Sequence, residues 1–261
     1  MKSSKKTKRS TKKFGKRRFA KKKPISFKKK VAKAVGSLAE VKYVSTGFAP
    51  TYHNSAISFG DALIMVPPMN QGLSNRQRVG AKVNFKNLKV KICISQAPFS
   101  LLTDLDRPVL VRCMLLKYKR GAYAADFPGT GFGGDVDYRL LQEDSSSPAQ
   151  PYDGSILKHL YDVNRDLFTV VKDWSFPLLP NEHNDTHTNT ETTALGKNFK
   201  ILTANVSGPT QLIYGADSNS LPNNFAPFLL IGYSYPDGDL ADILNRGLIA
   251  TVQATMSYTD E

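Results

Sequence analysis

The sequence predicts an all-β body that follows a strongly basic N-terminal arm. Beyond residue 40, apolar side chains recur mostly at every second position, which is typical of strands with one buried face. The first 39 residues hold 17 of the 36 Lys and Arg and none of the 22 Asp and Glu, so the remaining 222 residues carry a net charge of −3. The basic character of the protein therefore belongs to one segment.

We expect residues 1–39 to form a disordered nucleic-acid-binding arm and residues 40–261 to form one folded domain. Like charges in the arm repel one another, and its few apolar residues are too sparse to offset the entropy cost of ordering. The side chains expected to neutralise phosphates are Lys5, Lys6, Lys8, Arg9, Lys12, Lys13, Lys16, Arg17, Arg18, Lys21, Lys22, Lys23, Lys28, Lys29 and Lys30.

Two aromatic residues, Phe14 and Phe19, lie inside the basic run. They could stack on unpaired bases, although two aromatics in so long a segment can equally arise by chance. The run also has the composition of a nuclear localisation signal, which needs only about 5 to 8 basic residues. Because the arm carries many more, its charge favours nucleic-acid packaging, and the two roles are compatible.

The body contains eight runs with the spacing of strands. In "KNLKVKICIS", Leu88, Val90, Ile92 and Ile94 share one face and Lys89, Lys91, Cys93 and Ser95 share the other. The predicted strands are 41–48, 80–95, 108–118, 166–178, 198–206, 210–214, 225–235 and 247–258. Eight strands with so little helix indicate a sandwich or a barrel.

The segments between these strands are long and rich in Gly, Pro, Ser, Asn and Thr: 49–79, 119–154, 179–196 and 215–224. Short helices are predicted only at 155–161, with Ser155 as N-cap, and at 239–247, with Asp239 as N-cap. "GTGFGG" (129–134) matches a dinucleotide-binding fingerprint but lacks the flanking strand and helix, so we expect a surface loop there.

Strand periodicity also predicts on which face of its strand each cysteine and the single tryptophan lies. Cys93 falls on the lysine-bearing face of its strand and Cys113 on an apolar face, so we expect no disulfide between them. Trp174 has the same parity as Phe168 and Phe176, which predicts that all three face the core.

Several functional classes lack support in the sequence. The sequence contains no run of 18 apolar residues, so we expect no transmembrane helix. The N-terminus lacks the apolar segment that a secretory signal requires. His183 and His187 have the spacing of a metal pair, but their Asn- and Thr-rich surroundings indicate a polar loop. No catalytic motif has supporting context, so we expect neither a cofactor nor enzymatic activity.

Three stretches resemble the capsid proteins of circular Rep-encoding single-stranded DNA viruses, a group around the circoviruses. "VPPMNQGLSNRQRVGAKVNFKNLKVKI" (66–92) is similar to their "PP-N-G" loop followed by "R-x-G-x-K", through Pro67, Pro68, Asn70, Gly72, Arg78, Gly80 and Lys82. "LYDVNRDLFTVVKDWSF" (160–176) resembles a "D-x-x-F-x-V-x-x-D" strand, and "ATMSYTDE" (254–261) resembles the closing strand. The order of the three stretches matters more than any one of them.

The resemblance implies a single eight-stranded jelly roll with two facing four-stranded antiparallel sheets. It further implies self-assembly into a T=1 icosahedral shell, packaging of a small circular single-stranded DNA genome, and residence in the virion and the host nucleus. A nuclear import receptor and a host-cell surface attachment factor would be further partners. Arg76, Arg78 and Lys82 form a candidate secondary basic patch on the body.

The arm departs from the Arg-dominated arms of circoviruses because it is mostly Lys. Lys binds phosphate as a point charge, whereas Arg offers a planar fork, so this composition predicts binding capacity without sequence specificity. Two other classes stay open. A cellular nucleic-acid-binding β domain with a basic tail would also carry a basic patch, and a lectin-like sandwich would use long loops but has no need of the arm.

Overall fold

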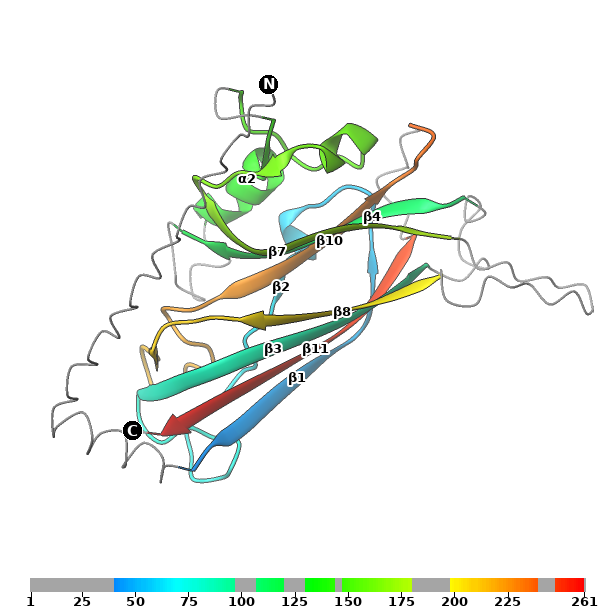
Figure 1. Ribbon diagram of the computed structural model, residues 1–261. Coiled ribbons are helices and arrows are strands. Elements are labelled where there is room, and N and C mark those ends of the chain that lie inside the picture. The colour runs from blue at the N-terminus through cyan, green and yellow to red at the C-terminus, as the bar shows by residue number, and fades with distance from the viewer. Residues whose placement is uncertain are drawn as a thin grey trace, which may run out of the picture. The chain divides into compact units, whose positions relative to one another are not determined.

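The computed structural model describes residues 40–96, 107–119, 130–143, 147–179, 198–238 and 247–260. Its strands form two facing antiparallel sheets, called sheet A and sheet B (Figure 1). Sheet A contains, in order, β1 (Lys42–His53), β11 (Leu248–Asp260), β3 (Lys82–Gln96) and β8 (Phe199–Val206), and the short β9 (Gln211–Ile213) also pairs with β3. Sheet B contains β2 (Leu63–Ile64), β10 (Pro227–Ser234), β4 (Val109–Tyr118) and β7 (Phe168–Leu178).

The smaller elements lie between these strands. They are the 3-10 turns η1 (Phe59–Asp61) and η4 (Ile156–His159), the helix α2 (Thr130–Arg139), and the two-stranded sheet β5 (Leu141–Gln142) and β6 (Asp162–Val163). The short helix expected after Ser155 is therefore present as η4. No helix in the described ranges is long and apolar enough to cross a bilayer.

The pairing follows one rule through both sheets. Strands from the first half of the chain pair with strands from the second half in reverse order: β1 with β11, β2 with β10, β3 with β8 and β4 with β7. The chain therefore runs as one long two-stranded ribbon. The pairs β11 with β3 and β10 with β4 then join segments of this ribbon into the two sheets.

The main core lies between the sheets and confirms the predicted alternation. Leu88, Val90, Ile92 and Ile94 of β3 are fully buried, while Lys89 and Lys91 are exposed. Apolar residues from β10 and β4 of sheet B complete the same cluster. Because each strand of sheet A has one buried and one exposed face, its side chains alternate as the sequence predicts.

Sheet B differs because its two inner strands, β10 and β4, are covered on both faces, whereas its edge strand β7 has exposed residues. All eight residues of β10 are buried, and a second apolar cluster lies on the side of sheet B that faces away from sheet A. That cluster includes residues of α2 and of the segment 140–167. Burial on both faces explains why "PFLLIGYS" reads as a continuous apolar run rather than an alternating one.

The helix α2 corrects the expectation of a loop at "GTGFGG". Tertiary contacts override the low helix propensity of its glycines: Val136 and Leu140, four residues apart, are both buried in the second cluster. Asp137 accepts the backbone N–H of Phe59 at 2.6 Å, and Asp135 accepts the hydroxyl of Tyr118. Sequence periodicity could not show these contacts, because the partners are distant in the chain.

The parity prediction for β7 is wrong for Phe168. A bulge in the pairing of β7 with β4 shifts the register between Leu115 and Leu116, so residues on either side of it face opposite ways. Phe168 packs in the second cluster, whereas Phe176 packs in the main core, with Trp174 half-buried against it. At this bulge β7 has one residue more than β4, and the sequence pattern does not indicate it.

All eight predicted runs contain strands, and seven of them are long strands of the two sheets. The run 210–214 forms β9, which adds to one end of β3. The fourth strand of sheet B is instead β2, which lies inside the predicted loop 49–79. Two residues are too short a run to show a period, so β2 left no pattern in the sequence.

A buried ion pair fastens the segment around η4 to sheet B. The side chain of Arg112 on β4 is only 4% exposed and contacts Asp173 on β7 through two nitrogens, at 2.7 and 3.2 Å. Its remaining donors bind the carbonyl oxygens of Lys158 and Tyr161. One guanidinium therefore links two strands and the segment that covers them.

His53 at the end of β1 is 1% exposed, and neither ring nitrogen has a hydrogen-bond partner among the described residues. Burial lowers the pKa of His53 to about 4, and the nearby charge of Asp61 only partly opposes this effect. The unfolded chain takes up this proton near pH 6.5, before the folded chain does. The stability that neutral His53 provides is therefore complete above about pH 6.5 and is lost as the pH falls towards 4.

Replacing His53 with Leu should flatten the dependence of unfolding free energy on pH between 6.5 and 4. The lowered pKa of His53 corresponds to a change in unfolding free energy on the order of 3 kcal/mol between these two pH values. Urea unfolding at several pH values measures it. Some dependence will remain, because burial and the charge of Arg112 also lower the pKa of His159 to about 4. An unchanged slope in the His53→Leu variant would contradict this assignment.

Both cysteines are free, as expected: Cys113 is buried in sheet B and Cys93 is half-buried in sheet A. Burial raises the pKa of the Cys113 thiol, which keeps it protonated. The predicted helix 239–247, except for Gly247, and the pair His183 and His187 lie outside the described residues.

Candidate nucleic-acid interface

The outer face of sheet A is open to solvent and carries both polar side chains and exposed apolar ones such as Tyr43 and Ile201. The inner strands β10 and β4 of sheet B are covered on their outer side, whereas β1, β3, β8 and β11 of sheet A expose about every second side chain to solvent. The strand β3 supplies the cations of this face. Leu88, Val90 and Ile92 point into the core, so Lys89 and Lys91 between them point outward.

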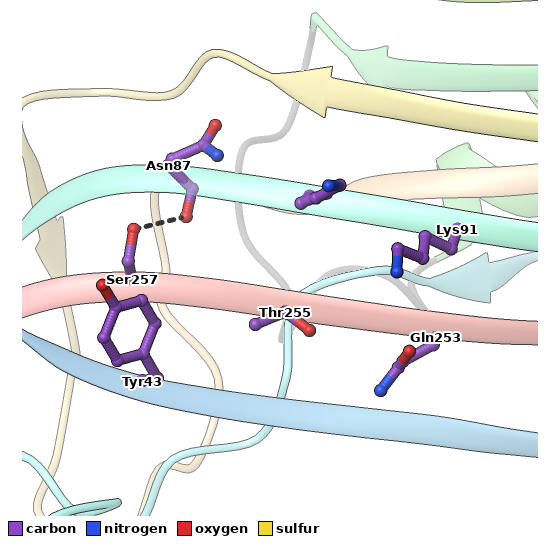
Figure 2. A pocket seen from close by; sticks show the side chains of 7 residues that line it. Tyr43, Asn87, Lys91, Gln253, Thr255 and Ser257 are labelled. Atoms are coloured by element: carbon purple, nitrogen blue, oxygen red, sulfur yellow. Dashed lines mark hydrogen bonds between the residues drawn. The ribbon is translucent and has the colours of Figure 1, made fainter.

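A shallow hollow of about 310 Å³ lies in this face, over three neighbouring strands (Figure 2). Register explains its composition, because Ser257 of β11 lies between Tyr43 of β1 and Asn87 of β3. The next two rows inward pair Thr255 with Lys89 and Gln253 with Lys91. The lining residues are Tyr43, Asn87, Lys89, Lys91, Gln253, Thr255 and Ser257.

The lining of this hollow has a positive charge that no acidic residue offsets. It contains two Lys and neither Asp nor Glu. The nearest acidic position on these strands, Asp260, is paired with Lys42 at 2.6 Å. The other lining groups are hydroxyls and amides, which can donate and accept hydrogen bonds. The surface is therefore suited to a polar anionic ligand.

The structure separates the three residues of the predicted secondary basic patch. Arg76 is exposed in the loop before β3, and Lys82 is exposed at the start of β3. Val83 next to Lys82 is fully buried, so Lys82 points to the outer face of sheet A, as Lys89 and Lys91 do. Arg78 does not belong to this surface, because it is 0% exposed.

Arg78 is a structural residue, which corrects its assignment as a phosphate contact. Its Nη2 donates to the carbonyl oxygens of Ala216, Asp217 and Asn219 at 3.0 to 3.1 Å, and its Nη1 donates to that of Gly80. The guanidinium also lies 4.3 Å from the ring centre of Tyr214. These contacts occupy both terminal nitrogens with backbone carbonyls and hold the 216–219 turn in place, whereas the buried Nε has no hydrogen-bond partner among the described residues.

The cationic residues of the predicted arm, together with Phe14 and Phe19, lie outside the described residues. Their assignment to phosphate neutralisation and base stacking stays a prediction. Among the residues that the structure describes, no group of three or more His, Cys, Asp or Glu side chains is arranged to hold a metal ion.

Sequence reasoning missed most of the hollow. Alternation shows that Tyr43, Gln253, Thr255 and Ser257 lie on the opposite side of their strands from the core residues. It does not show that β1, β11 and β3 are neighbours, because more than 150 residues separate β3 from β11. Only the pairing of β11 with β1 and with β3, which the sequence does not reveal, brings these residues together.

Comparison with known proteins adds little to this geometry. No protein-family model matches the chain, and no curated protein does. Among solved structures, the chain is similar to one from desmodium yellow mottle tymovirus, with 9% sequence identity and a TM-score of 0.33, over 100% of this chain and 96% of that chain. A likeness at this level does not bear on the assignment of function.

Proposed function

We propose that this protein is a non-enzymatic viral coat protein with a jelly-roll body. Its copies assemble into a closed T=1 shell, and the basic arm neutralises the phosphates of a packaged single-stranded DNA genome. About 60 copies would supply on the order of a thousand arm cations, which is enough for a small genome. The arm also serves as a nuclear localisation signal, which places the protein in the host nucleus before it enters the virion.

The strand pairing supports the jelly-roll part of the proposal. The ribbon in which β1, β2, β3 and β4 pair in turn with β11, β10, β8 and β7 supplies four strands to each sheet, and β9 adds a fifth to sheet A. Such pairing is what a jelly roll requires, and that architecture is found in viral capsid and lectin domains. The fold alone does not choose between those functions.

The observation that carries the functional proposal is the division of charge. A segment with 17 cationic and no anionic side chains precedes a body of net charge −3. A lectin-like sandwich has no use for such a segment. A coat protein does, because a neutral body can pack closely against its copies while the segment neutralises the genome.

Contacts between two of the capsid-like stretches are consistent with this family assignment. The hydroxyl of Tyr258 donates to the carbonyl of Gln77 at 3.0 Å, and burial together with the charge of Asp260 raises the pKa of Tyr258 to about 12. Asp260 accepts the backbone N–H of Val79 at 3.2 Å. The end of β11 therefore holds the loop that contains "R-x-G-x-K".

A cellular nucleic-acid-binding domain with a basic tail is the second candidate, because the outer face of sheet A also presents Lys82, Lys89 and Lys91. The assembly state of the purified protein distinguishes a coat protein from a cellular nucleic-acid-binding domain. Negative-stain electron microscopy of the purified full chain should show small, uniform spherical particles if it is a coat protein. Monomers or dimers alone, across a range of salt and pH, would contradict the proposal.

A further inference from the structure

The hollow on sheet A combines an exposed aromatic ring, two cations and several amides and hydroxyls. Tyr43 is 61% exposed although it lies within a strand. A ring so accessible on a folded sheet is available to a flat partner. Figure 2 shows Tyr43 at one end of the hollow and Lys91 with Gln253 towards the other, with Thr255 of β11 between the two ends.

The spacing of these groups follows from strand geometry. Lys89 and Lys91 are two residues apart on β3, so their α-carbons are about 7 Å apart. Tyr43 is two strands away from Asn87 in the same row, a distance of about 10 Å. These distances suit two neighbouring phosphates of an extended strand with a base turned towards the ring.

We propose that this hollow binds a short stretch of single-stranded nucleic acid. One base stacks on Tyr43, the adjacent phosphates contact Lys89 and Lys91, and the amides of Asn87 and Gln253 contact base edges. The inference deepens the proposed function, on which it rests for the identity of the ligand. It assigns a genome contact to the folded body, in addition to the arm.

The chemistry favours a single strand over the other occupants of such a face. In a duplex the bases are stacked on each other and are not available to Tyr43. A neutral sugar would leave Lys89 and Lys91 uncompensated, and an acidic peptide would lack the flat ring systems that stack. Stacking on an aromatic side chain accepts any base, which agrees with a contact that has no sequence preference.

Salt should distinguish this contact from those of the arm. Binding through phosphate charge weakens steeply as salt rises, whereas base stacking depends on salt far less. By general magnitudes, the loss of one stacked base lowers affinity by roughly 5- to 150-fold. In the full chain the arm masks this loss at low salt, so the test needs a readout at the residue itself.

The test is photocross-linking of the full chain to a single-stranded oligonucleotide that contains 5-iododeoxyuridine, followed by mass spectrometry of the peptides. We expect cross-links at Tyr43 that persist at salt concentrations where those to the arm have fallen at least tenfold. Tyr43→Leu should remove them, and Lys89→Gln with Lys91→Gln should reduce them severalfold. Circular dichroism and the urea midpoint verify that each variant folds.

Matched controls come from outside sheet A, on α2 and on strand β7 of sheet B. Tyr138 is 70% exposed on α2, and Lys172 is exposed on β7, so Tyr138→Leu and Lys172→Gln should leave the Tyr43 cross-links unchanged. A 5-iodouridine RNA used in parallel shows whether the hollow prefers DNA. An oligonucleotide with abasic sites in place of its bases should compete poorly for Tyr43.

Two failures can be told apart. If particles form and protect nucleic acid but Tyr43 is never cross-linked, the inference is wrong and the coat function is unaffected. If Tyr43 is cross-linked but no particles form, the hollow is confirmed as a single-strand site and the coat function is wrong. Cross-linking of Tyr138 as strong as that of Tyr43 would also overturn the inference, because it would indicate labelling by exposure alone.

Discussion

Replacing the 15 predicted phosphate-binding residues of the arm with Gln should abolish packaging of nucleic acid while particles still form. Each neutralised phosphate releases counterions, so the affinity of the arm falls with salt at a slope of about −0.7 per neutralised phosphate on a log-log scale for single strands. If about ten phosphates are no longer neutralised, binding near 0.1 M salt should fall at least 1,000-fold. Filter binding over a salt series measures both the affinity and the slope.

A second arm variant provides the control. Shuffling Lys and Arg within residues 1–39 keeps the charge of +17 and changes only the order. Because point charges without fixed geometry give capacity and not specificity, packaging by this variant should stay within about twofold of the original. A large loss on shuffling would indicate a specific arm structure. Unchanged packaging by the Gln variant would show that the arm is not the genome contact.

Replacing Arg112 with Met should destabilise the body by about 3 kcal/mol. The substitution leaves Asp173 without its cation and removes donors from the carbonyls of Lys158 and Tyr161. Water can reach Asp173, whose side chain is 29% exposed, so the loss should lie at the lower end for a broken buried pair. Urea unfolding followed by the fluorescence of Trp174, the single tryptophan, measures it.

Arg107 is the matched control for Arg112. Its pair with Asp237 is longer, at 3.5 Å, and the two side chains are 43% and 55% exposed, so Arg107→Met should cost less than about 1 kcal/mol. Adding Asp173→Leu to Arg112→Met should recover part of the stability, because it removes the unpaired carboxylate. Equal losses for Arg112→Met and Arg107→Met would show that the buried pair does not fasten the segment 156–161.

Strand alternation was the part of the fold that the sequence could predict well. β3 and β11 show it clearly, because one face of each lies in the core and the other lies in solvent. It failed where tertiary contacts decide the conformation. The glycines at 131, 133 and 134 lie in the helix α2, which forms because Val136 and the adjoining Leu140 are buried. The bulge in β7 turns Phe168 away from Phe176.

The candidate interface could be predicted only in part. Lys89 and Lys91 stand out as cations between buried residues of one strand, and Lys82 directly precedes the buried Val83. The structure places all three on the outer face of sheet A. Arg78 looked equivalent in sequence, yet it is buried because the 216–219 turn presents carbonyl oxygens to it. Nothing in the local sequence distinguishes an arginine that binds carbonyls from one that binds phosphates.

The most direct test of the central claim is negative-stain imaging of the purified full chain before and after nuclease treatment, with the protected nucleic acid then extracted and digested by DNase or RNase. The coat function predicts uniform spherical particles that survive nuclease and contain protected single-stranded DNA. A preparation of monomers or dimers whose nucleic acid is fully digested would contradict it.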